Sequence, residues 1–586
     1  MRVRASIAFI GLVVFVSLFA PGARTAPPAP SEESRLPAAL LERLSWSDDP
    51  SQLASLLGLR TFHGRPVSDA PASVLLRRVP PTFGRAFGRT AALTAADVSS
   101  LPDVAIGTNP SLTETRPSVA ASPSELRVVV AAYGGFVYPD APTRRCAVVR
   151  SVDGGRTFGA PAFLPRLGPT SACNDPVLTW SPNGQRLYAA YRDFKGGTEI
   201  LKPTPEGATR SRPYGDDDVV VSRSLDGGLT WSTPVVALDA DPWAYTVECT
   251  PGVFPCEITD VDPGSTFERP SISTPLDGVG NQVYVTATRF AEQDPDAPPT
   301  AVAFGRSDNG GQSWSATEVL DTGEAAPLPI LVQGARAAGG RGGEVLVAWY
   351  HSGNDGHLVG SFEIRARRSL TNGRTWGPVV VAASDANETG RDLGPFDFYK
   401  QWWPTMFPDV AVDRSGRAHI VYGHDPEPGN ATAEEGDVRY VTSRRTPWTE
   451  WSAPITLNDD GPGRAQGYAA LTVRHQGRQS VADVVWEDTR LTGDLEVVGS
   501  PAFTSPNRYY DLYHSRWLRT VGGGSWSANQ RVSDSSSLQD RAMNGGRTAV
   551  TANGLVLFAV WTDRRTITSV DNRKQDVAGS RVQPLP

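Results

Sequence analysis

Short apolar runs, separated by turn residues, recur along most of the chain. Seven of them have the length of a buried strand, and most end on an aromatic residue, at 128–133, 187–191, 283–288, 345–349, 419–422, 481–486 and 555–561. An apolar strand precedes several of these runs, and a third strand follows them. Many short strands at regular spacing predict an all-β fold rather than helices packed on one another.

An eight-residue motif follows the third strand in the first four units. It reads SVDGGRTF at 151–158, SLDGGLTW at 224–231, SDNGGQSW at 307–314 and, in a weaker form, SLTNGRTW at 369–376. A side-chain oxygen at the third position can accept hydrogen bonds from the N–H groups of a tight turn, and glycine supplies the unusual dihedral angles. We expect the final aromatic side chain to pack between units. The residues assigned this structural role are Asp153, Asp226, Asn309, Trp231, Trp314 and Trp376.

The motif has the form S-x-D-x-G-x-T-W and resembles the Asp-box, or BNR repeat, of sialidases and other Asp-box β-propellers. The resemblance implies a seven-bladed β-propeller of four-stranded antiparallel blades, with the six blades of a sialidase propeller as the alternative. The seventh unit ends after its third strand, at 576–581. We therefore predict that an N-terminal strand at 103–109 supplies the missing outer strand and closes the ring, which leaves no exposed sheet edge there.

The first hundred residues follow a different pattern. Arg2 and Arg4 precede an apolar run at 7–20, which is shorter than the roughly 20 residues of a membrane-spanning helix. This pattern is typical of a secretory signal peptide, assigned to 1–26. Residues 27–102 are assigned to an N-terminal arm, partly helical or irregular, and 103–586 to the propeller. We expect a secreted or extracytoplasmic protein, with the periplasm or cell surface as alternatives, and no stable membrane insertion after signal cleavage.

The four cysteines all follow the signal sequence. An even number of cysteines in an exported chain favours disulfides, and four cysteines allow three connectivities. We favour Cys249 with Cys256, which closes a small loop, and Cys146 with Cys173. A zinc site is not expected, because the sequence has no CxxC pair and its seven histidines are scattered.

Composition narrows the classes of function. The formal net charge is −7, so the chain lacks the basic footprint of a nucleic-acid-binding protein. The 57 glycines and 49 prolines suit turns between strands rather than long helices. No cofactor is expected. A Ca²⁺ site in the acidic run 216–218 is the alternative to a solvated run of charge. We expect a monomer.

Charged residues end several second strands, on the side that we expect to lie opposite the Asp-box turns. A D-x-R pattern recurs from Asp488 to Arg490 and from Asp563 to Arg565. Because arginine binds a carboxylate through two parallel hydrogen bonds, a rim of this kind suits an acidic sugar. The alternative is salt bridging between blades.

Two further features point to the same face. An aromatic segment at 396–403 precedes the fifth unit and offers either platforms on which sugars stack or a loop plug over the axis. Arg116 and Arg269 each begin an inner strand and precede a proline. Sialidases carry one of three carboxylate-binding arginines at a matching place in an Arg-Ile-Pro motif, whose middle residue is missing here.

The resemblance implies the sialidase set of three arginines, an aspartate acid/base and a tyrosine nucleophile polarised by a glutamate. The candidate catalytic residues are Arg116, Asp193, Glu487, Asp488, Arg490, Arg565 and Tyr510, with Tyr509 as an alternative to Tyr510. The candidate substrate-binding residues are Arg269, Tyr399, Trp402 and Trp403. The hypothesis is a secreted sialidase-like glycoside hydrolase, of the exo-alpha-sialidase class, that acts on terminal or acidic sugars of glycans or glycoconjugates. The alternatives are a non-catalytic glycan- or protein-binding propeller and an assembly scaffold.

Overall fold

The computed structural model describes most of the chain between residues 101 and 582. The described residues are 61–62, 65–66, 101–107, 113–136, 144–205, 207–250, 256–278, 281–292, 294, 296–324, 330–352, 360–387, 407–424, 436–443, 448–461, 464–476, 479–492, 509–520, 523–538, 548–563, 565 and 575–582. Within these ranges no helix is long and apolar enough to cross a membrane. The predicted helical part of the N-terminal arm lies outside them, and the described part of the arm includes a short hairpin of β1 (Thr61–Phe62) and β2 (Arg65–Pro66).

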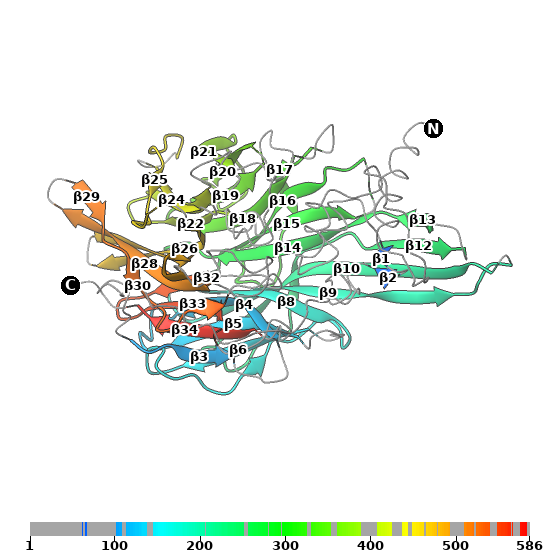
Figure 1. Cartoon of the computed structure of the whole chain (residues 1–586), viewed down its shortest axis with the longest axis horizontal. Helices are drawn as coiled ribbons and strands as arrows, with labels where there is room; N and C mark the ends of the chain where they lie inside the picture. Colours follow the sequence, from blue (N-terminus) through cyan, green and yellow to red (C-terminus); the bar gives the residue numbers. More distant parts are fainter. Residues whose placement is uncertain are drawn as a thin grey trace, which may run out of the picture.

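Seven antiparallel sheets surround a common axis as the blades of a propeller (Figure 1). From the axis outward, blade 1 has β4 (Thr113–Ala121), β5 (Val129–Phe136), β6 (Arg145–Ser151) and β7 (Ala162–Phe163); blade 2 has β8 (Ala172–Trp180), β9 (Leu187–Leu201), β10 (Thr209–Ser224) and β11 (Val235–Leu238); blade 3 has β14 (Gly264–Ser273), β15 (Val283–Glu292), β16 (Thr300–Ser307) and β17 (Glu318–Thr322); blade 4 has β18 (Val332–Gly339), β19 (Val345–His351), β20 (Gly360–Ser369) and β21 (Val380–Asn387).

The remaining blades follow the same plan. Blade 5 has β22 (Asp409–Val412), β23 (Ala418–His424), β24 (Asp437–Thr442) and β25 (Ile455–Thr456); blade 6 has β26 (Gln466–Gln476), β27 (Gln479–Asp488) and β28 (Tyr509–Thr520), with β29 (Gly523–Trp526), β30 (Gln530–Arg531) and β31 (Ser537–Leu538) along its outer edge; blade 7 has β32 (Thr548–Ala552), β33 (Leu557–Asp563) and β34 (Asp576–Arg581). The predicted seven four-stranded blades are confirmed, and the six-bladed alternative is wrong.

The fourth strand of blade 7 comes from the beginning of the described propeller. β3 (Val104–Gly107) pairs antiparallel with β34, and Val104 lies opposite Gly579. The strand predicted at 103–109 therefore occupies the open outer position. Its pairing removes the free edge that β34 would otherwise present to other chains.

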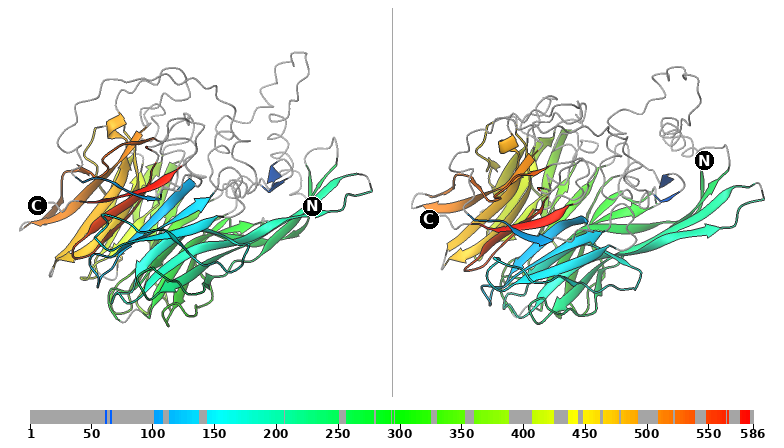
Figure 2. Two further views of the ribbon diagram at one scale, coloured as in Figure 1. Left: turned by 90° about the horizontal axis from the view of Figure 1, so that it is seen from below. Right: turned by 60° about the horizontal axis from the view of Figure 1, so that its bottom comes forward.

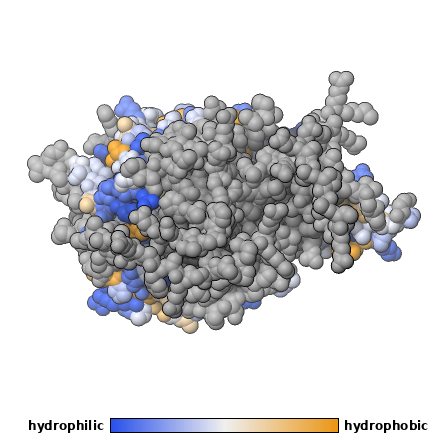
Figure 3. Space-filling view, in the orientation of Figure 1, coloured by the Kyte–Doolittle hydropathy of each residue, from blue (hydrophilic) through white to orange (hydrophobic). Residues whose placement is uncertain are grey.

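The hydrophobic core is divided among the interfaces between blades. One cluster joins blades 7 and 1 through Ile106, Val119 and Phe558, and another joins blades 1 and 2 through Val130 and Tyr191. The aromatic residues predicted at the ends of second strands lie in these interfaces, and most are almost wholly buried. On the face shown in Figure 3, the visible described residues are mainly hydrophilic, with small hydrophobic areas among them. Burial of apolar surface between neighbouring blades is thus the main stabilising contribution to the ring.

The first four blades have the predicted tight turns between their third and fourth strands. In blade 1, Asp153 Oδ1 accepts hydrogen bonds from the backbone N–H groups of Arg156 and Thr157 at 2.9 and 3.0 Å. Ser151 Oγ accepts one from Gly155 N at 2.8 Å. The blade 3 turn repeats this pattern with an amide in place of the carboxylate, because Asn309 Oδ1 accepts two backbone N–H groups. The sequence motif therefore closes a turn with internal hydrogen bonds.

The aromatic residue that ends each turn packs against the preceding blade. The Trp376 ring lies edge-on to Phe304 of blade 3, with 4.9 Å between centroids. The Phe158 ring lies 5.7 Å from Phe558 of blade 7. The turns lie on one side of the ring, together with the turns between first and second strands, as shown by the hydrogen bond from Gly154 N to the Arg127 carbonyl at 2.8 Å. We call this side the box face and the opposite side the loop face.

Both predicted disulfides are confirmed. Cys146 and Cys173 join β6 of blade 1 to β8 of blade 2, and both side chains are fully buried. Cys249 and Cys256 close a short loop at the end of β12 (Trp243–Cys249). β12 pairs with β10 and with β13 (Glu257–Asp262), so blade 2 continues into an arm that projects from the ring (Figures 1 and 2).

Candidate functional site

Five of the seven inner strands contain a bulge at the same level of the ring. The backbone φ is positive at each bulge, with values of 55° at Arg116, 51° at Asp175, 50° at Arg269, 65° at Gly334 and 51° at Tyr468. For a residue other than glycine this conformation costs of order 1–3 kcal/mol and is concentrated at functional sites. We call Arg116, Asp175, Arg269 and Tyr468 the axial ring, because they occupy equivalent places on strands that surround the axis.

A buried network of opposite charges holds one side of the axial ring. Arg116 Nη1 lies 3.1 Å from Asp175 Oδ2. Arg192 Nη1 lies 3.6 Å from the same oxygen and 3.1 Å from Glu268 Oε1, and Arg192 also pairs with Asp217. These side chains are at most a tenth exposed, so the charges must neutralise one another to offset their loss of hydration. The network fixes three carboxylates, two from blade 2 and one from blade 3, around the Arg192 guanidinium group.

Arg269 lacks the carboxylate contacts of its neighbours. Its guanidinium carbon lies 5.2 Å from the centre of the Phe407 ring, and it forms no ion pair with a residue in the described ranges. Burial lowers the pKa of Arg269 and the nearby charge of Arg116 lowers it further, whereas the nearby carboxylates of Asp175 and Glu268 oppose this effect. A desolvated cation on an aromatic face favours the approach of an anion.

A channel of about 450 Å³ lies on the axis, on the box side of the axial ring. All seven inner strands line it, mainly with small and hydroxyl-bearing side chains. Arg336 enters it from blade 4, with its Nη1 atom 3.4 Å from the Pro270 carbonyl and its Nε atom 4.0 Å from Asp409. Burial lowers the pKa of Arg336. Three arginines thus lie on three inner strands, with the carboxylates of Asp175, Glu268 and Asp409 near them.

Glu487, a predicted catalytic residue, lies between blades 6 and 7. Its carboxyl group is fully buried and accepts a hydrogen bond from Thr548 Oγ1 at 3.2 Å through Oε1, while Oε2 has no hydrogen-bond partner among the described residues. Burial raises the pKa of Glu487 to about 8. The side chain is therefore protonated at neutral pH, as a general acid must be. Across the strand pair it lies opposite Gly467, next to Tyr468 of the axial ring.

Asp193 and Tyr510 each form a hydrogen bond with the backbone of a neighbouring segment. Asp193 Oδ2 accepts a hydrogen bond from Leu167 N at 3.0 Å, and burial raises the pKa of Asp193. The Tyr510 hydroxyl donates a short hydrogen bond to the Thr562 carbonyl and is almost fully buried. The hydrogen bonds therefore tie both candidates to neighbouring backbone, and a catalytic role for either stays a prediction.

A tyrosine–glutamate pair does occur in blade 1. Burial and the adjacent Glu114 carboxylate both raise the pKa of Tyr133. A raised pKa disfavours the tyrosinate, so this pairing does not activate the hydroxyl as a nucleophile. Glu114 lies on β4, the strand that also carries Arg116.

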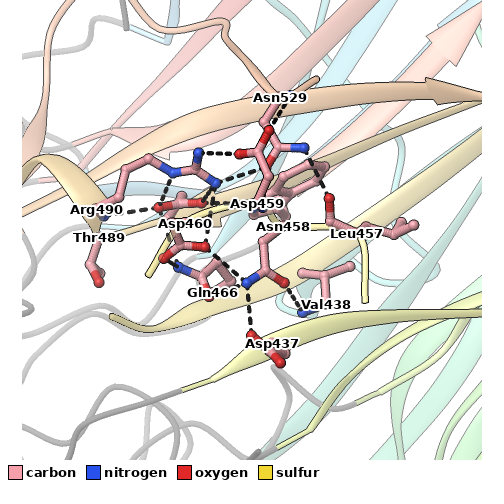
Figure 4. Close-up of polar contacts among 12 residues, drawn as sticks. Asp437, Val438, Leu457, Asn458, Asp459, Asp460, Gln466, Thr489, Arg490 and Asn529 are labelled. Carbon is pink, nitrogen blue, oxygen red and sulfur yellow. Dashed lines mark hydrogen bonds and ion pairs between the residues drawn. The ribbon is translucent and has the colours of Figure 1, made fainter. Parts of the chain in front are cut away.

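Arg490 joins three segments of the loop face (Figure 4). Its Nη2 atom lies 2.8 Å from Asp488 Oδ2, its Nη1 atom lies 2.8 Å from Asp459 Oδ1, and its Nη2 atom also donates to Asn529 at 2.8 Å. Asp459 belongs to the connection from blade 5, and these carboxylates raise the pKa of Arg490. The contacts fit the alternative of salt bridging between blades.

Arg565 repeats this arrangement one blade later. Its guanidinium group lies within 2.7 Å of Asp563, Asp103 and Asp534, which come from β33, from the residue before β3 and from the segment between β30 and β31 of blade 6. The three carboxylates occupy its nitrogen atoms. Arg490 and Arg565 therefore hold neighbouring segments together, and a catalytic role for either stays a prediction without support from its contacts.

Three predicted substrate-binding residues, Tyr399, Trp402 and Trp403, lie outside the described residues, as does the side chain of Tyr509. In the described ranges no three His, Cys, Asp or Glu side chains are grouped so that they could hold a metal ion. In the acidic run 216–218, the central residue Asp217 pairs with Arg192.

Sequence reasoning found Arg116 and Arg269 but did not select Asp175, Arg192, Glu268 or Tyr468. One feature of the sequence could have identified part of this set. A charged residue precedes a proline at the beginning of three inner strands, namely arginine at 116 and 269 and aspartate at 175. A residue before proline normally adopts an extended conformation. The positive φ that gathers these side chains was therefore not expected from the sequence.

No family model and no curated protein matches the chain. Among solved structures, the chain is similar to a Hadza microbial sialidase, with a TM-score of 0.37, 14% identity and coverage of 64% of this chain. It covers 63% of that sialidase, less than two thirds of its length. It is also similar to an alpha-L-arabinanase from Penicillium chrysogenum complexed with arabinobiose, with a TM-score of 0.37, 12% identity and coverage of 66% and 94% of the two chains.

A third solved structure is a mutant of the NanB sialidase from Streptococcus pneumoniae. Its TM-score is 0.37, its identity is 11%, and the alignment covers 84% of this chain and 73% of the sialidase. The described part of the chain is a seven-bladed β-propeller, and the solved structures to which it is similar include two sialidases and an arabinanase.

Proposed function

We propose that the chain is a glycoside hydrolase that binds an acidic sugar at the axial ring. The observation that carries this proposal is Arg269, a desolvated guanidinium without an ion pair among the described residues, which lies near Arg116 on the axis. Guanidinium groups bind carboxylates through paired hydrogen bonds, and the aromatic ring of Phe407 holds the cation in place. A carboxylate-bearing sugar offers the matching charge.

Hydrolysis requires two carboxyl groups with different protonation states. Asp175 and Glu268 share Arg192 Nη1 and supply carboxylates that can activate water or attack the anomeric carbon. Glu487 holds a proton at neutral pH and is our candidate donor to the leaving oxygen. The sialidase-type substrate remains the first to test, because the sugar of a sialoside carries a carboxylate.

The test uses the full chain, a fluorogenic sialoside and a panel of uronides and neutral glycosides. We expect turnover of an acidic glycoside, and we expect Arg269→Gln to reduce kcat/KM at least about a hundredfold by removing a charge-assisted contact. Arg289→Gln is the matched control, because Arg289 also lies on the loop side but pairs with the exposed Asp241. Equal loss in both variants, or faster turnover of neutral than of acidic glycosides, would contradict the proposal.

The second candidate is a propeller that binds an acidic glycan without cleaving it. The buried hydroxyl of Tyr510 and the carboxylate-paired Arg490 and Arg565 favour it, because these three residues are taken up by structural contacts. A glycan array read beside the turnover assay separates the two candidates. Binding that Arg269→Gln abolishes, with no turnover of any substrate, would select this second function.

A further inference from the structure

Three buried polar atoms of blades 6 and 7 have no hydrogen-bond partner among the described residues. They are Oε2 of Glu487 on β27, Nδ1 of His514 on β28 and Oγ of Ser580 on β34. All three side chains are fully buried, with an exposed fraction of 0%. Since nearly all buried polar groups in folded proteins have a hydrogen-bond partner, three orphaned atoms on neighbouring blades point to a shared partner.

The strand register brings Glu487 and His514 together. Glu487 and Val485 lie on the same face of β27, because alternate residues of a strand share a face. Val485 belongs to one hydrophobic cluster with Ala559 of blade 7, so this face is directed toward blade 7 (Figure 1). His514 lies opposite Val485 in the pair of β27 with β28, and Leu512 lies opposite Glu487. Glu487 and His514 are therefore diagonal neighbours, at a typical separation of about 7–8 Å.

Ser580 faces the same part of the interface from blade 7. It pairs with Ala559 of β33, so the two side chains share a face of the sheet. Its alternate neighbours on β34, Ala578 and Val582, belong to the same hydrophobic cluster as Ala559. Blade 7 thus presents alanine and serine at this level, which are the small side chains that a water-sized space needs.

A hydrogen bond between the blades fixes the level of the two sheets. Thr548 Oγ1 on β32 donates to Glu487 Oε1 at 3.2 Å. Thr548 pairs with Trp561 of β33, so Glu487 lies at the level of Trp561. Two residues closer to the box face, the next row of blade 6 contains His514 and the next row of blade 7 contains Ser580. These two residues therefore occupy the same level on the facing third strands.

The orphaned atoms are complementary as donor and acceptor. Burial raises the pKa of Glu487 to about 8, and because Thr548 donates to Oε1, the proton of the neutral carboxyl group lies on Oε2. Burial lowers the pKa of His514, so its ring is neutral. Its Nε2 atom lies 2.9 Å from Asp483 Oδ1 and carries the ring proton, which leaves Nδ1 as an acceptor.

The charged groups of this interface keep the two protonation states in place. Asp483 also accepts hydrogen bonds from Arg474 Nε at 2.9 Å and from Arg516 Nε at 2.6 Å. Although burial opposes them, the contacts with His514 and the two arginines lower the pKa of Asp483, so this carboxylate holds the Nε2 proton of His514. The other titratable side chains directed into the interface from the described strands lie toward its loop end and are Tyr510, Asp563 and Asp576.

We propose that Glu487, His514 and Ser580 bind one buried water molecule, which accepts the acidic proton of Glu487 and donates to His514 Nδ1 and Ser580 Oγ. A buried water commonly forms about three hydrogen bonds with groups that would otherwise lack a partner. Since both protons of this water are taken by acceptors, it stabilises the neutral carboxyl group rather than the carboxylate. His514 is thereby a positioning residue for the proton of Glu487. The site itself is independent of the proposed activity, and only the use of this proton in hydrolysis rests on that activity.

The experiment is infrared spectroscopy of the full chain, with the spectrum of Glu487→Gln subtracted to isolate the carbonyl band of the protonated Glu487. We expect a band at the position of a carboxyl group that donates a hydrogen bond. His514→Gln keeps an amide beside Asp483 but removes Nδ1. Its band should move to the position of a free carboxyl group, and the pKa of Glu487 should fall by about 0.5–1, the effect of one hydrogen bond. His514→Asn is the matched control, because its amide oxygen can replace Nδ1 and should keep the band of wild type.

Ser580→Ala provides a second test that leaves the ring of His514 intact. We expect the band to move in the same direction as in H514Q, by a smaller amount, while circular dichroism shows an unchanged fold. An unchanged band in S580A would mean that Glu487 contacts His514 without a water and would overturn the site. Equal shifts in H514Q and H514N would assign the effect to packing instead of to Nδ1.

Two results for wild type would also overturn the proposal. One is a band at the position of a free carboxyl group, or no band that Glu487→Gln removes. The other is a band that moves with chloride concentration, which would identify an anion beside Arg516, whose Nη2 atom also lacks a hydrogen-bond partner among the described residues. None of these measurements uses turnover, so their outcome is separate from that of the test for hydrolysis.

Discussion

Glu487 lies wholly inside the interface between blades 6 and 7, where a single hydrogen bond from Thr548 reaches its carboxyl group. At the scale of single residues, this carboxyl and the Arg192 network show two ways of burying charge. Arg192 keeps its charge because carboxylates surround it, whereas Glu487 gives up its charge because no cation lies beside it.

The raised pKa of Glu487 makes folding depend on pH. The pKa of this carboxyl group is near 4.5 in the unfolded chain and about 8 in the folded chain. Between these pH values the unfolded chain loses the proton while the folded chain retains it, so the free energy of unfolding falls as pH rises. Glu487→Gln removes this dependence. Relative to wild type, the variant should gain of order 3 kcal/mol between pH 5 and pH 8, measured by urea unfolding. Glu125→Gln, at an exposed glutamate, is the control, and parallel pH profiles for wild type and E487Q would contradict the assignment.

At the scale of elements, the box turn is a unit whose hydrogen bonds depend on one acceptor. Asp226 accepts two backbone N–H groups and the Thr230 hydroxyl in blade 2, which together with the Ser224 contact lower the pKa of Asp226 to about 2 despite the opposing effect of desolvation. Asn309 shows that an amide oxygen can take the same place.

Substitutions at Asp226 should distinguish the stabilisation that comes from its hydrogen bonds from the stabilisation that comes from its negative charge. Asp226→Ala leaves two N–H groups without their partner and should cost about 1–2 kcal/mol, in keeping with the loss of other local caps. Asp226→Asn retains an oxygen that accepts the hydrogen bonds, so its loss in free energy of unfolding should be less than half that of Asp226→Ala. Thermal unfolding of the two variants beside wild type is the measurement. An equal cost in both would show that charge, rather than the hydrogen bonds, stabilises the turn.

The elements could be predicted from the sequence because their signals are local and repeated. The turn motif, the strand runs and the disulfide of Cys249 with Cys256 each lie within a few residues. Salt bridging of Arg490 and Arg565 between blades was one of two alternatives from the sequence, but partners such as Asp459 and Asp103 could not be named, because they lie far from the arginines in the sequence. The axial ring was missed in part for the same reason: a bulge with positive φ brings together residues of five separate strands.

At the scale of the whole molecule, a cluster of charges secures the closure of the ring. Asp103 N donates to Asp534 Oδ2 and Asp534 N donates to Asp103 Oδ2, each at 2.9 Å, and Arg565 pairs with both carboxylates. Burial, together with the hydrogen bond to Asp534, raises the pKa of Asp103 to about 7. Asp103 therefore keeps its proton up to about pH 7 at the junction of β3 with the segment between β30 and β31.

The cluster of Asp103, Asp534 and Arg565 should stabilise the folded chain less as pH rises through about 7. Since the pKa of Asp103 is raised in the folded chain, its contribution is complete below pH 4 and is lost as pH rises through about 7. In addition to the loss assigned to Glu487, wild type should lose of order 2 kcal/mol over this range through Asp103, and Asp103→Asn should not lose this part. Urea unfolding at pH 5 and pH 8 tests this, with Asp277→Asn on the box face as the control. A loss between the two pH values that is as large in D103N as in wild type would assign the whole pH dependence to other groups.

The pairing of β3 with β34 has a consequence for the time course of synthesis. Asp103 and Arg565 touch across 462 positions of sequence, so the first strand of the ring has no partner until the last one has been made. Loop closure over such a distance is slow, and an unpaired strand edge invites wrong partners while it waits. A nascent chain that lacks its final twenty residues would therefore lack β34, and the strand edges of β3 and β33 that pair with it would stay unpaired.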